Sequence, residues 1–298
     1  MPSTREIRLR IRSVKNLSQV TRALETVSAS KVRRAIRANE RTRPYAARAW
    51  RILTHLASQP GHQSMHPLLA SRPEIKNILM ILISSDRGLA GAYNMNIVRE
   101  ALLRAAEFHT DVSYITVGKR GRDMLLRRQQ KIVGEFSNIS ADSSYLEITP
   151  IGQLVVEEYL SGHVDAVYVA YTDFETMLQQ SPTIRMLLPF RIEDTRDADS
   201  HYGSQVKQKF VYTYEPSQEE ILNDIIPDFT ALQIYQSVLS AMASEHAARM
   251  IAMQNATSSA KELASILELE YNKLRQANIT NEMLDIAGGA EALTQTVR

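Results

Sequence analysis

The segment SSDRGLAGAYN, residues 84–94, is the part of the sequence best suited to hold a small molecule. Gly88 and Gly91 follow a strongly apolar run and precede a helical pattern. Such a strand-to-helix turn is where many α/β proteins bind phosphate groups. The glycine spacing does not match the G-x-G-x-x-G pattern of dinucleotide-binding turns. The alternative, which this spacing favours, is a structural turn in which glycine relieves backbone strain.

Other residue types that could do chemistry are not arranged for it. The segment VGKRGRD, residues 117–123, has a Gly-Lys pair but lacks the upstream glycine and the Ser/Thr of a phosphate-binding loop. His62 and His66 are four residues apart, but flanking prolines and a glycine prevent a helical face that could bind a metal. There is no G-x-S-x-G motif. The sequence therefore predicts no catalytic residue, no metal and no cofactor.

Composition sets the outer limits on the class of protein. The chain has 298 residues and 44% apolar content, enough for a sizeable core in one or two domains. It has no cysteine, which excludes disulfides and thiolate chemistry. The longest aliphatic run, residues 78–83, is far short of the roughly 20 residues that cross a bilayer. We expect no direct membrane insertion, so any membrane link goes through partners.

The first part of the chain is typical of one long helix. Ser3 and Glu6 form a possible capping box. Pro44 is the only proline between Pro2 and Pro60, and the pattern predicts a helix from about Thr4 to Ala57 that could bend at Pro44. Apolar residues recur at spacings of three or four, at Ile7, Ile11, Val14, Leu17, Val20, Leu24 and Val27.

A second long helix is predicted at the other end. Pro227 is expected to break or kink its first turns, and Gly288 with Gly289 to terminate it. Many small residues surround the apolar seam, which favours a close antiparallel coiled coil with the first helix. The predicted seam comprises Phe229, Leu232, Leu239, Met242, Met250, Met253, Ala256, Ala260, Leu263, Leu267, Tyr271 and Leu274.

Between these helices, short apolar runs alternate with helical stretches. Strands are predicted at residues 77–84, 112–117, 131–136, 164–171 and 183–190, and helices at about 94–108, 120–129 and 150–161. This alternation indicates an open, mostly parallel α/β sheet with helices on both faces, a Rossmann-like domain. The polar segment 193–209 is expected to be a surface loop or hairpin end. The predicted organisation is thus a helix at 1–60, a sheet domain at 75–215 and a helix at 216–298, with the sheet domain inserted between the two coiled-coil helices.

Charge separates the two ends of the chain. Residues 1–51 hold fourteen Lys/Arg and three acids, a net charge of +11, whereas residues 216–298 carry a net charge of −6. Opposite charges favour pairing of the ends. Two helices of this length exceed what one small domain can cover, so partners are expected to cover their remaining surface. The stretch RQANITNEML, residues 275–284, fits this expectation because it has little charge.

Three blocks of the sequence resemble the gamma subunit of bacterial F-type ATP synthases. They are IRLRIRSVKNLSQVTRALETVSASKVRRA (7–35), ISSDRGLAGAYNMNI (83–97), and ASEHAARMIAMQNATSSAKEL together with YNKLRQANITNEMLDIAGGAEAL within 243–293. The resemblance runs from end to end of the chain. The absence of cysteine implies that the thiol-regulated insertion of chloroplast members has no counterpart here.

The resemblance implies a non-catalytic rotor shaft in a proton-transporting rotary motor. In that family the paired helices enter a ring of three alpha and three beta subunits, and the sheet domain holds the epsilon subunit and the membrane c-ring. Rotation changes the beta subunits in turn, and these subunits carry the chemistry of ATP synthesis and hydrolysis. The chain is then expected at the cytoplasmic face of the cell membrane, as a peripheral membrane protein.

The resemblance also suggests contact residues. Arg275 and Gln276 match positions that touch a beta-subunit loop, and Leu24 lies where the family usually has methionine, next to the same contact region. Solvated helix-surface residues are the alternative explanation for Arg275 and Gln276. The end of the second helix is expected to seat in the apolar collar of the ring, through Ile286, Ala287, Ala290 and Leu293.

Two other classes of protein compete with the rotor. The basic first helix could be a nucleic-acid-binding arm, but its charges are spread around the helix and its few aromatics are Tyr45 and Trp50. Steeply salt-dependent DNA binding by the chain would support that class. A nucleotide-binding α/β enzyme would require the chain alone to bind ATP.

Overall fold

The computed structural model describes residues 3–57, 67–69, 72, 74–139, 145–190 and 218–296, without the side chains of residues 43, 50–57, 218–224 and 288–296. His62, His66 and the predicted loop 193–209 lie outside these residues. The chain divides into two compact units. Residues 28–249 form the sheet unit, and residues 1–27 with 250–298 form the coil unit. The sequence-based division at residues 60, 75 and 215 stays a prediction.

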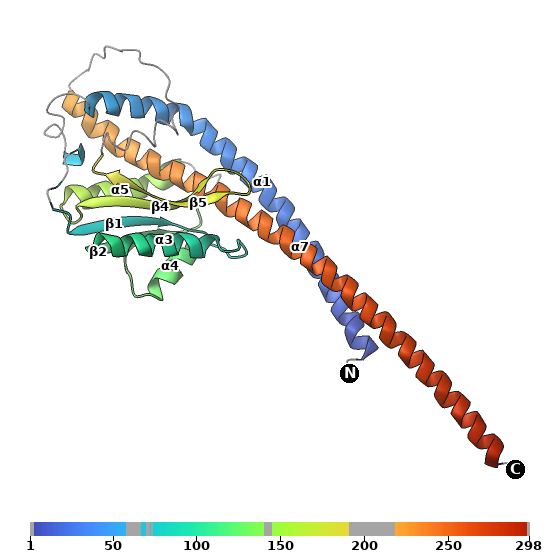
Figure 1. Ribbon diagram of the computed structural model, residues 1–298. Coiled ribbons are helices and arrows are strands. Elements are labelled where there is room, and N and C mark those ends of the chain that lie inside the picture. The colour runs from blue at the N-terminus through green and yellow to red at the C-terminus, as the bar shows by residue number, and fades with distance from the viewer. Residues whose placement is uncertain are drawn as a thin grey trace. The chain divides into compact units, whose positions relative to one another are not determined.

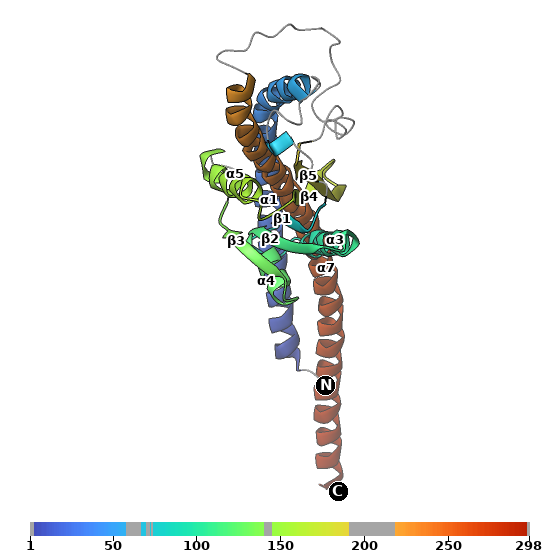
Figure 2. The same cartoon turned by 90° about the vertical axis from the view of Figure 1, so that its left-hand side faces the viewer.

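The sheet unit contains a five-stranded sheet in the order β3-β2-β1-β4-β5. The strands are β1 (Asn77–Ile83), β2 (Asp111–Val117), β3 (Lys131–Phe136), β4 (Ala166–Phe174) and β5 (Gln180–Leu188). The first four are parallel and β5 pairs antiparallel with β4. Figure 2 shows the strands following one another in this order. The predicted open, mostly parallel sheet is confirmed.

Helices cover both faces of the sheet (Figure 1), with α5 (Tyr145–Leu160) on one face and α3 (Tyr93–Phe108) and α4 (Lys119–Leu126) on the other. Alternate residues of β1 enter two separate cores. Ile81 packs with the α5 core, whereas Leu82 packs with α3 and α4. A central strand buried on both faces must be apolar throughout, which explains the unbroken run NILMILI.

Two long helices complete the chain, α1 (Thr4–Ala57) and α7 (Gln218–Thr296). Helix α1 has the predicted bounds and continues through Pro44. The expected break at Pro227 and the expected end at Gly288 and Gly289 were wrong, because α7 is helical on both sides of Pro227 and continues through both glycines. A kink at Pro227 stays a prediction. A proline inside a helix costs about 3 kcal/mol or more. Next to Pro227, burial of Ile226 and Phe229 in the core offsets part of this cost.

The coil unit pairs the start of α1 with the second half of α7 in antiparallel directions. The Thr21 and Thr257 hydroxyl oxygens are 2.7 Å apart, and Lys15 Nζ lies 2.6 Å from Glu268 Oε1. A residue nearer the start of α1 therefore contacts a residue nearer the end of α7. On α7 the buried residues follow a heptad spacing typical of a coiled coil, at Met253, Thr257, Ala260 and Ala264.

The seam differs in detail from the predicted one. Thr257 and Ala264 are buried where Ala256 and Leu263 were expected, and Leu263 is exposed. On α1, Ile7 and Thr21 are buried, whereas three residues of the predicted apolar periodicity are about half exposed. These residues are Leu17, Val20 and Val27. The buried residues of the coil thus include polar and small side chains as well as Ile7 and Met253, while several other large apolar side chains are exposed.

The buried threonine pair satisfies its own hydrogen bonds. Thr257 Oγ1 lies 2.8 Å from the Met253 carbonyl oxygen, and Thr21 Oγ1 lies 3.1 Å from that of Ser18. One hydroxyl can donate across the coil while the other donates to its own helix. The bond to Met253 is the shorter of the two, which favours an arrangement in which the Thr21 hydroxyl donates to Thr257 and the Thr257 hydroxyl donates to the Met253 carbonyl. The polar pair therefore costs little desolvation.

Two buried tyrosines give a matched test of the packing in the sheet unit. Tyr93 donates its hydroxyl to the Ala241 carbonyl of α7 at 3.0 Å, whereas the buried Tyr114 hydroxyl has no hydrogen-bond partner among the described residues. We expect Tyr93→Phe to lower the free energy of unfolding by about 1 kcal/mol, and Tyr114→Phe to leave it unchanged or raise it. Urea unfolding of the full chain measures both values. Equal losses for the two variants would contradict this account.

Candidate functional site

The segment 84–94 lies at the carboxyl end of β1 and forms a closely bonded turn. Asp86 accepts hydrogen bonds from the backbone N–H groups of Lys119 and Asn138, at 3.1 and 2.9 Å. Ser84 Oγ accepts the Gly121 N–H at 2.9 Å. The turn thus joins the ends of β1, β2 and β3 through protein groups, and its polar atoms are used for structure.

Two glycines opposite this turn are required by close packing. A Cβ atom on Gly118 would lie 2.2 Å from the Ser84 carbonyl oxygen, and one on Gly121 would lie 2.6 Å from Ser84 Oγ. Gly118 also has φ of +102°, which L side chains rarely adopt. The glycines of VGKRGRD therefore allow two loops to approach each other, which differs from the role of glycine in a phosphate-binding loop.

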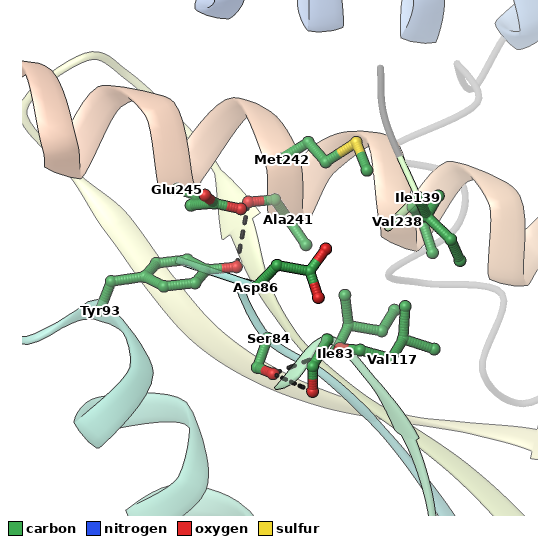
Figure 3. Close-up of a pocket in the computed structure, with 11 residues that line it drawn as sticks. Ile83, Ser84, Asp86, Tyr93, Val117, Ile139, Val238, Ala241, Met242 and Glu245 are labelled. Atoms are coloured by element: carbon green, nitrogen blue, oxygen red, sulfur yellow. Dashed lines mark hydrogen bonds between the residues drawn. The ribbon is translucent and has the colours of Figure 1, made fainter. Parts of the chain in front are cut away.

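Helix α7 fills the crevice where α/β proteins of this topology bind ligands, at the carboxyl ends of the central strands. Figure 3 shows Val238, Ala241, Met242 and Glu245 of α7 facing Asp86 and Ser84. The remaining cavity is about 20 Å³. That is enough for a water molecule, whereas small-molecule sites occupy several hundred Å³. The structural interpretation of segment 84–94 fits this geometry, and a nucleotide does not.

Arg249 of α7 holds the same turn from its other side. Its guanidinium donates from Nε and Nη2 to the Gly88 carbonyl, each at 3.2 Å, and from Nη2 to Glu245 Oε1 at 2.6 Å. Leu89, the next residue of the turn, has φ of 65° and a side chain that is 64% exposed. A non-glycine residue in the left-handed region carries strain that its surroundings must offset.

Buried ionisable groups gather around Arg249. His246 Nδ1 lies 3.1 Å from Arg249 Nη1. Burial lowers the pKa of His246 to about 4, with smaller contributions from Arg249 and Lys31. Burial also raises the pKa of Glu245, more than Arg249 lowers it. Neutral His246 can accept the Arg249 hydrogen bond, so the cluster is built to hold Arg249 in place.

The predicted partner-contact residues lie at different places on the coil unit. Leu24 is half-buried, whereas the Arg275 and Gln276 side chains are exposed. The antiparallel pairing sets Leu24 opposite the region of Met253. That region is about 30 Å along α7 from Arg275. The structure therefore does not bring Leu24 next to Arg275 within the chain, and their contact with one region of a partner stays a prediction.

The predicted collar residues are described only in part. The Ile286 side chain is 74% exposed and Ala287 is also exposed. The side chains of Ala290 and Leu293 lie outside the described residues. In fact every side chain from residue 275 to residue 287 is exposed, and this stretch includes the large apolar residues Ile279, Met283, Leu284 and Ile286.

The polar residues that connect α7 to α1 and to the sheet were not predicted from the sequence. Thr21, Thr257, Ser240 and Arg249 all lie on helix faces that an apolar pattern cannot identify. One signal was present for Arg249, because Glu245 precedes it by four residues and such a pair is typical of an ion pair within a helix. Nothing in the sequence indicated that Arg249 also reaches the turn at Gly88.

The described part of the chain also bears on metals and membranes. In residues 3–57, 67–69, 72, 74–139, 145–190 and 218–296, no three His, Cys, Asp or Glu side chains gather as metal ligands would. Across those same ranges, each helix is too short or too polar to span a bilayer.

Comparison with protein families places the chain in a class of energy-converting assemblies. The model of the ATP synthase family matches residues 3–293. The solved rotor of the mitochondrial ATP synthase from Euglena gracilis aligns with a TM-score of 0.63 at 20% identity, covering 93% of this chain and 98% of that one. The central stalk from Tetrahymena thermophila gives a TM-score of 0.57 at 24% identity, covering 80% and 99%. At these identities the structures show a shared fold.

Relatives in bacteria define the subunit. The ATP synthase gamma chain of Roseiflexus castenholzii is 46% identical over 298 residues, which cover 99% of this chain and 100% of the relative. That of Chloroflexus aurantiacus is 41% identical over 305 residues, with coverage of 99% and 100%. The chain therefore belongs to the ATP synthase gamma chain family, and is a subunit of that enzyme complex.

The lowered pKa of the partly buried His246 leads to a prediction of how the stability of the fold depends on pH. The folded pKa of His246, about 4, lies below its ordinary value of 6.5. The unfolded chain therefore binds more protons between these values, and stability present above pH 6.5 is lost as the pH falls toward 4. At pH 5 the loss is about 1–2 kcal/mol.

We expect His246→Gln to remove this part of the pH dependence while keeping a hydrogen-bond acceptor beside Arg249. Urea unfolding at pH 7.5 and pH 5 compares the variant with the original chain, and His163→Gln serves as control because His163 is exposed. An equal pH dependence with and without His246 would show that this side chain is not held neutral by burial.

Proposed function

We propose that the chain is the central rotor shaft of a proton-translocating ATP synthase. The coil unit occupies the central cavity of a ring of three alpha and three beta subunits, and the sheet unit holds the epsilon subunit and the membrane c-ring. Rotation of the c-ring turns the shaft, and the shaft changes the conformation of each beta subunit in sequence. The family membership and the shared fold with solved rotors support this proposal.

The observation that carries the proposal is the surface of the coil unit. Residues 275–287 of α7 are exposed throughout and include four large apolar side chains. Further exposed apolar residues lie on both helices, at Leu9, Leu17, Val20, Val27, Leu263, Ile266 and Leu269. Exposed large apolar side chains that gather in one part of a protein mark sites of protein contact. The low charge of residues 275–284 suits a surface that must slide past a partner without forming strong ion pairs.

Rotation can drive catalysis only through unequal contacts. A shaft shifts the equilibrium of a beta subunit by the difference in its interaction free energy with the open and closed conformations. The coil presents both exposed apolar side chains, such as Leu263 and Met283, and exposed charged ones, such as Lys273 and Glu282, and these do not repeat with a threefold symmetry. As it turns, each beta subunit therefore meets a different surface, and its affinity for ADP, phosphate and ATP changes accordingly.

Particular residues have proposed roles in these contacts. Arg275 and Gln276 are exposed donors that could form and break hydrogen bonds with a beta-subunit loop at each step. Leu24 provides an apolar contact at a second position on the coil. Ile286, Ala287, Ala290 and Leu293 seat the end of α7 in the apolar collar of the ring.

The proposed role is mechanical, and ATP chemistry belongs to the beta subunits. The filled crevice at the sheet edge supports a non-catalytic chain, because the turn at residues 84–94 binds α7 and neighbouring strand ends. The chain reaches the cytoplasmic face of the cell membrane as a peripheral subunit through the c-ring. The nucleic-acid alternative gains no support from the comparisons.

Assembly tests the proposed function directly. The chain is co-expressed with alpha and beta subunits from a relative, with the alpha and beta subunits alone as the control. We expect a stable complex containing one copy of the chain and three copies of each partner, with ATP hydrolysis that depends on the chain. Recovery of the chain as a separate species that binds or hydrolyses labelled ATP by itself would refute the proposal.

A charge at Leu24 is expected to weaken coupling. Leu24 is half-buried on α1, and Leu24→Lys would place an ammonium group against an apolar contact, with a desolvation cost of about 1–3 kcal/mol. Protons pumped per ATP hydrolysed should fall, while Thr26→Lys, at an exposed position, controls for added charge. An unchanged ratio in the Leu24 variant would count against this contact.

Shortening α7 should reduce torque before it affects folding. The side chains of residues 275–287 are exposed and are not part of the hydrophobic core of the chain. Removing residues 288–298 is expected to leave the unfolding free energy of the isolated chain within about 0.5 kcal/mol, and to lower the stall torque of single rotating complexes. Loss of stability that equals or precedes loss of torque would contradict the collar role.

A further inference from the structure

Helix α7 has two kinds of contact with the sheet unit between residues 226 and 249. The first is apolar packing into the α5 face of the sheet, through residues such as Phe229, Leu232, Ile234 and Val238. Apolar burial is strong but non-directional. Such a surface holds a helix against a sheet, yet allows small rotations and shifts because packed helices can slide past one another.

The second kind of contact is directional and reaches four separate elements. Tyr145 of α5 donates its hydroxyl to the Asp228 carbonyl at 3.1 Å. Tyr93 of α3 donates to the Ala241 carbonyl at 3.0 Å. Ser240 Oγ donates to Asp173 Oδ1 at 2.7 Å and accepts the Phe174 N–H at 2.9 Å, at the end of β4.

Arg249 makes the fourth connection, to the turn after β1. Its guanidinium donates to the Gly88 carbonyl from two nitrogens and is oriented by Glu245 on the same helix. The Arg249 and Glu245 side chains are only 12% and 15% exposed. A planar guanidinium with several fixed donors holds one orientation, and its charge strengthens each bond.

The positions of these contacts around the axis of α7 determine whether they can resist rotation of the helix. Ser240 and Arg249 are nine residues apart, which is about two and a half helical turns. Their side chains therefore leave opposite sides of the helix, toward β4 and toward the turn after β1. Hydrogen bonds weaken steeply when their angles change. Rotation of α7 about its own axis would strain the bonds on both sides.

We propose that Tyr93, Ser240 and Arg249 form a torsional lock that makes the sheet unit and the α7 segment 226–249 turn as one body. They are positioning residues, and this role rests on the proposed function as a rotor shaft. Torque that enters through the sheet unit passes into α7 through directional bonds, while the apolar face keeps the helix in place. Loss of the lock would let the sheet unit turn partly without the helix.

The chain offers matched controls for each member. Ser237 is buried on α7 like Ser240, but its hydroxyl donates to the Gln233 carbonyl of its own helix. Tyr114 is buried like Tyr93, and its hydroxyl has no hydrogen-bond partner in the part of the chain that the structure describes. Arg104 pairs with Glu107 on its own helix. The lock variant is Y93F/S240A/R249Q and the control variant is Y114F/S237A/R104Q, so both have identical changes in composition.

Spin labels report the lock in the isolated chain, which has no native cysteine. Labels are placed at Leu160→Cys, at the end of α5, and at Gln233→Cys on α7. Pulsed electron resonance then gives the distribution of distances between them. We expect a broader distribution in the lock variant and an unchanged one in the control variant. A distribution as narrow as that of the original chain would overturn the lock.

Coupling in the assembled complex tests the positioning role. Protons pumped per ATP hydrolysed should fall in the lock variant while hydrolysis continues, and should be unchanged in the control variant. Broadened distances with an unchanged ratio would overturn the role in torque transfer. If the triple variant does not fold, Ser240→Ala is compared with Ser237→Ala by both measurements. Should the chain fail to assemble at all, the rotor proposal fails, and the label distances still decide whether the lock exists.

Discussion

Helix α7 packs against the sheet in its first part and lies in the coil unit in its second part. The rest of the structure depends on this single helix fitting both environments. Between residues 226 and 249, α7 is buried against the sheet and closes the crevice at the strand ends. From residue 275 to residue 287 every side chain of the same helix is exposed. Helical hydrogen bonding continues through both parts, so side chains alone determine what each part contacts. Large apolar residues such as Phe229 and Leu232 pack against the sheet, and the smaller residues Thr257, Ala260 and Ala264 are buried in the coil.

The filled crevice shows how an α/β sheet of this topology can use its strand ends for packing within the chain. Open parallel sheets bind ligands where strand order reverses, because loop N–H groups and helix ends converge there. Here the turn after β1 uses those groups to bind the ends of β2 and β3, and α7 covers what remains. Ser240, Tyr93 and Arg249 then connect the helix to the edge with directional bonds. The crevice that binds a cofactor in other proteins is here the place where α7 is attached to the sheet.

Much of the fold could be predicted from the sequence, because strong local patterns agreed with the tertiary structure. The unbroken apolar run of β1 and the absence of glycine in α1 led to correct elements. The seam of the coil was predicted less well. Leu17, Val20 and Val27 follow a helical period, yet they face outward while Thr21 faces α7. A helix that packs against its own chain on one side and a partner on another is apolar on both, and periodicity cannot tell the sides apart. The contact residues carried over by resemblance share this limit, since their partners lie in other chains.

Hydrogen exchange along α7 tests the central claim most directly. The full chain is compared alone and in the complex with alpha and beta subunits. This account predicts that amides of residues 226–249 exchange slowly in both samples, because the sheet already covers them, and that amides of residues 275–287 become protected only in the complex. Equal exchange of residues 275–287 in the two samples would show that no partner covers this surface, and would contradict the account.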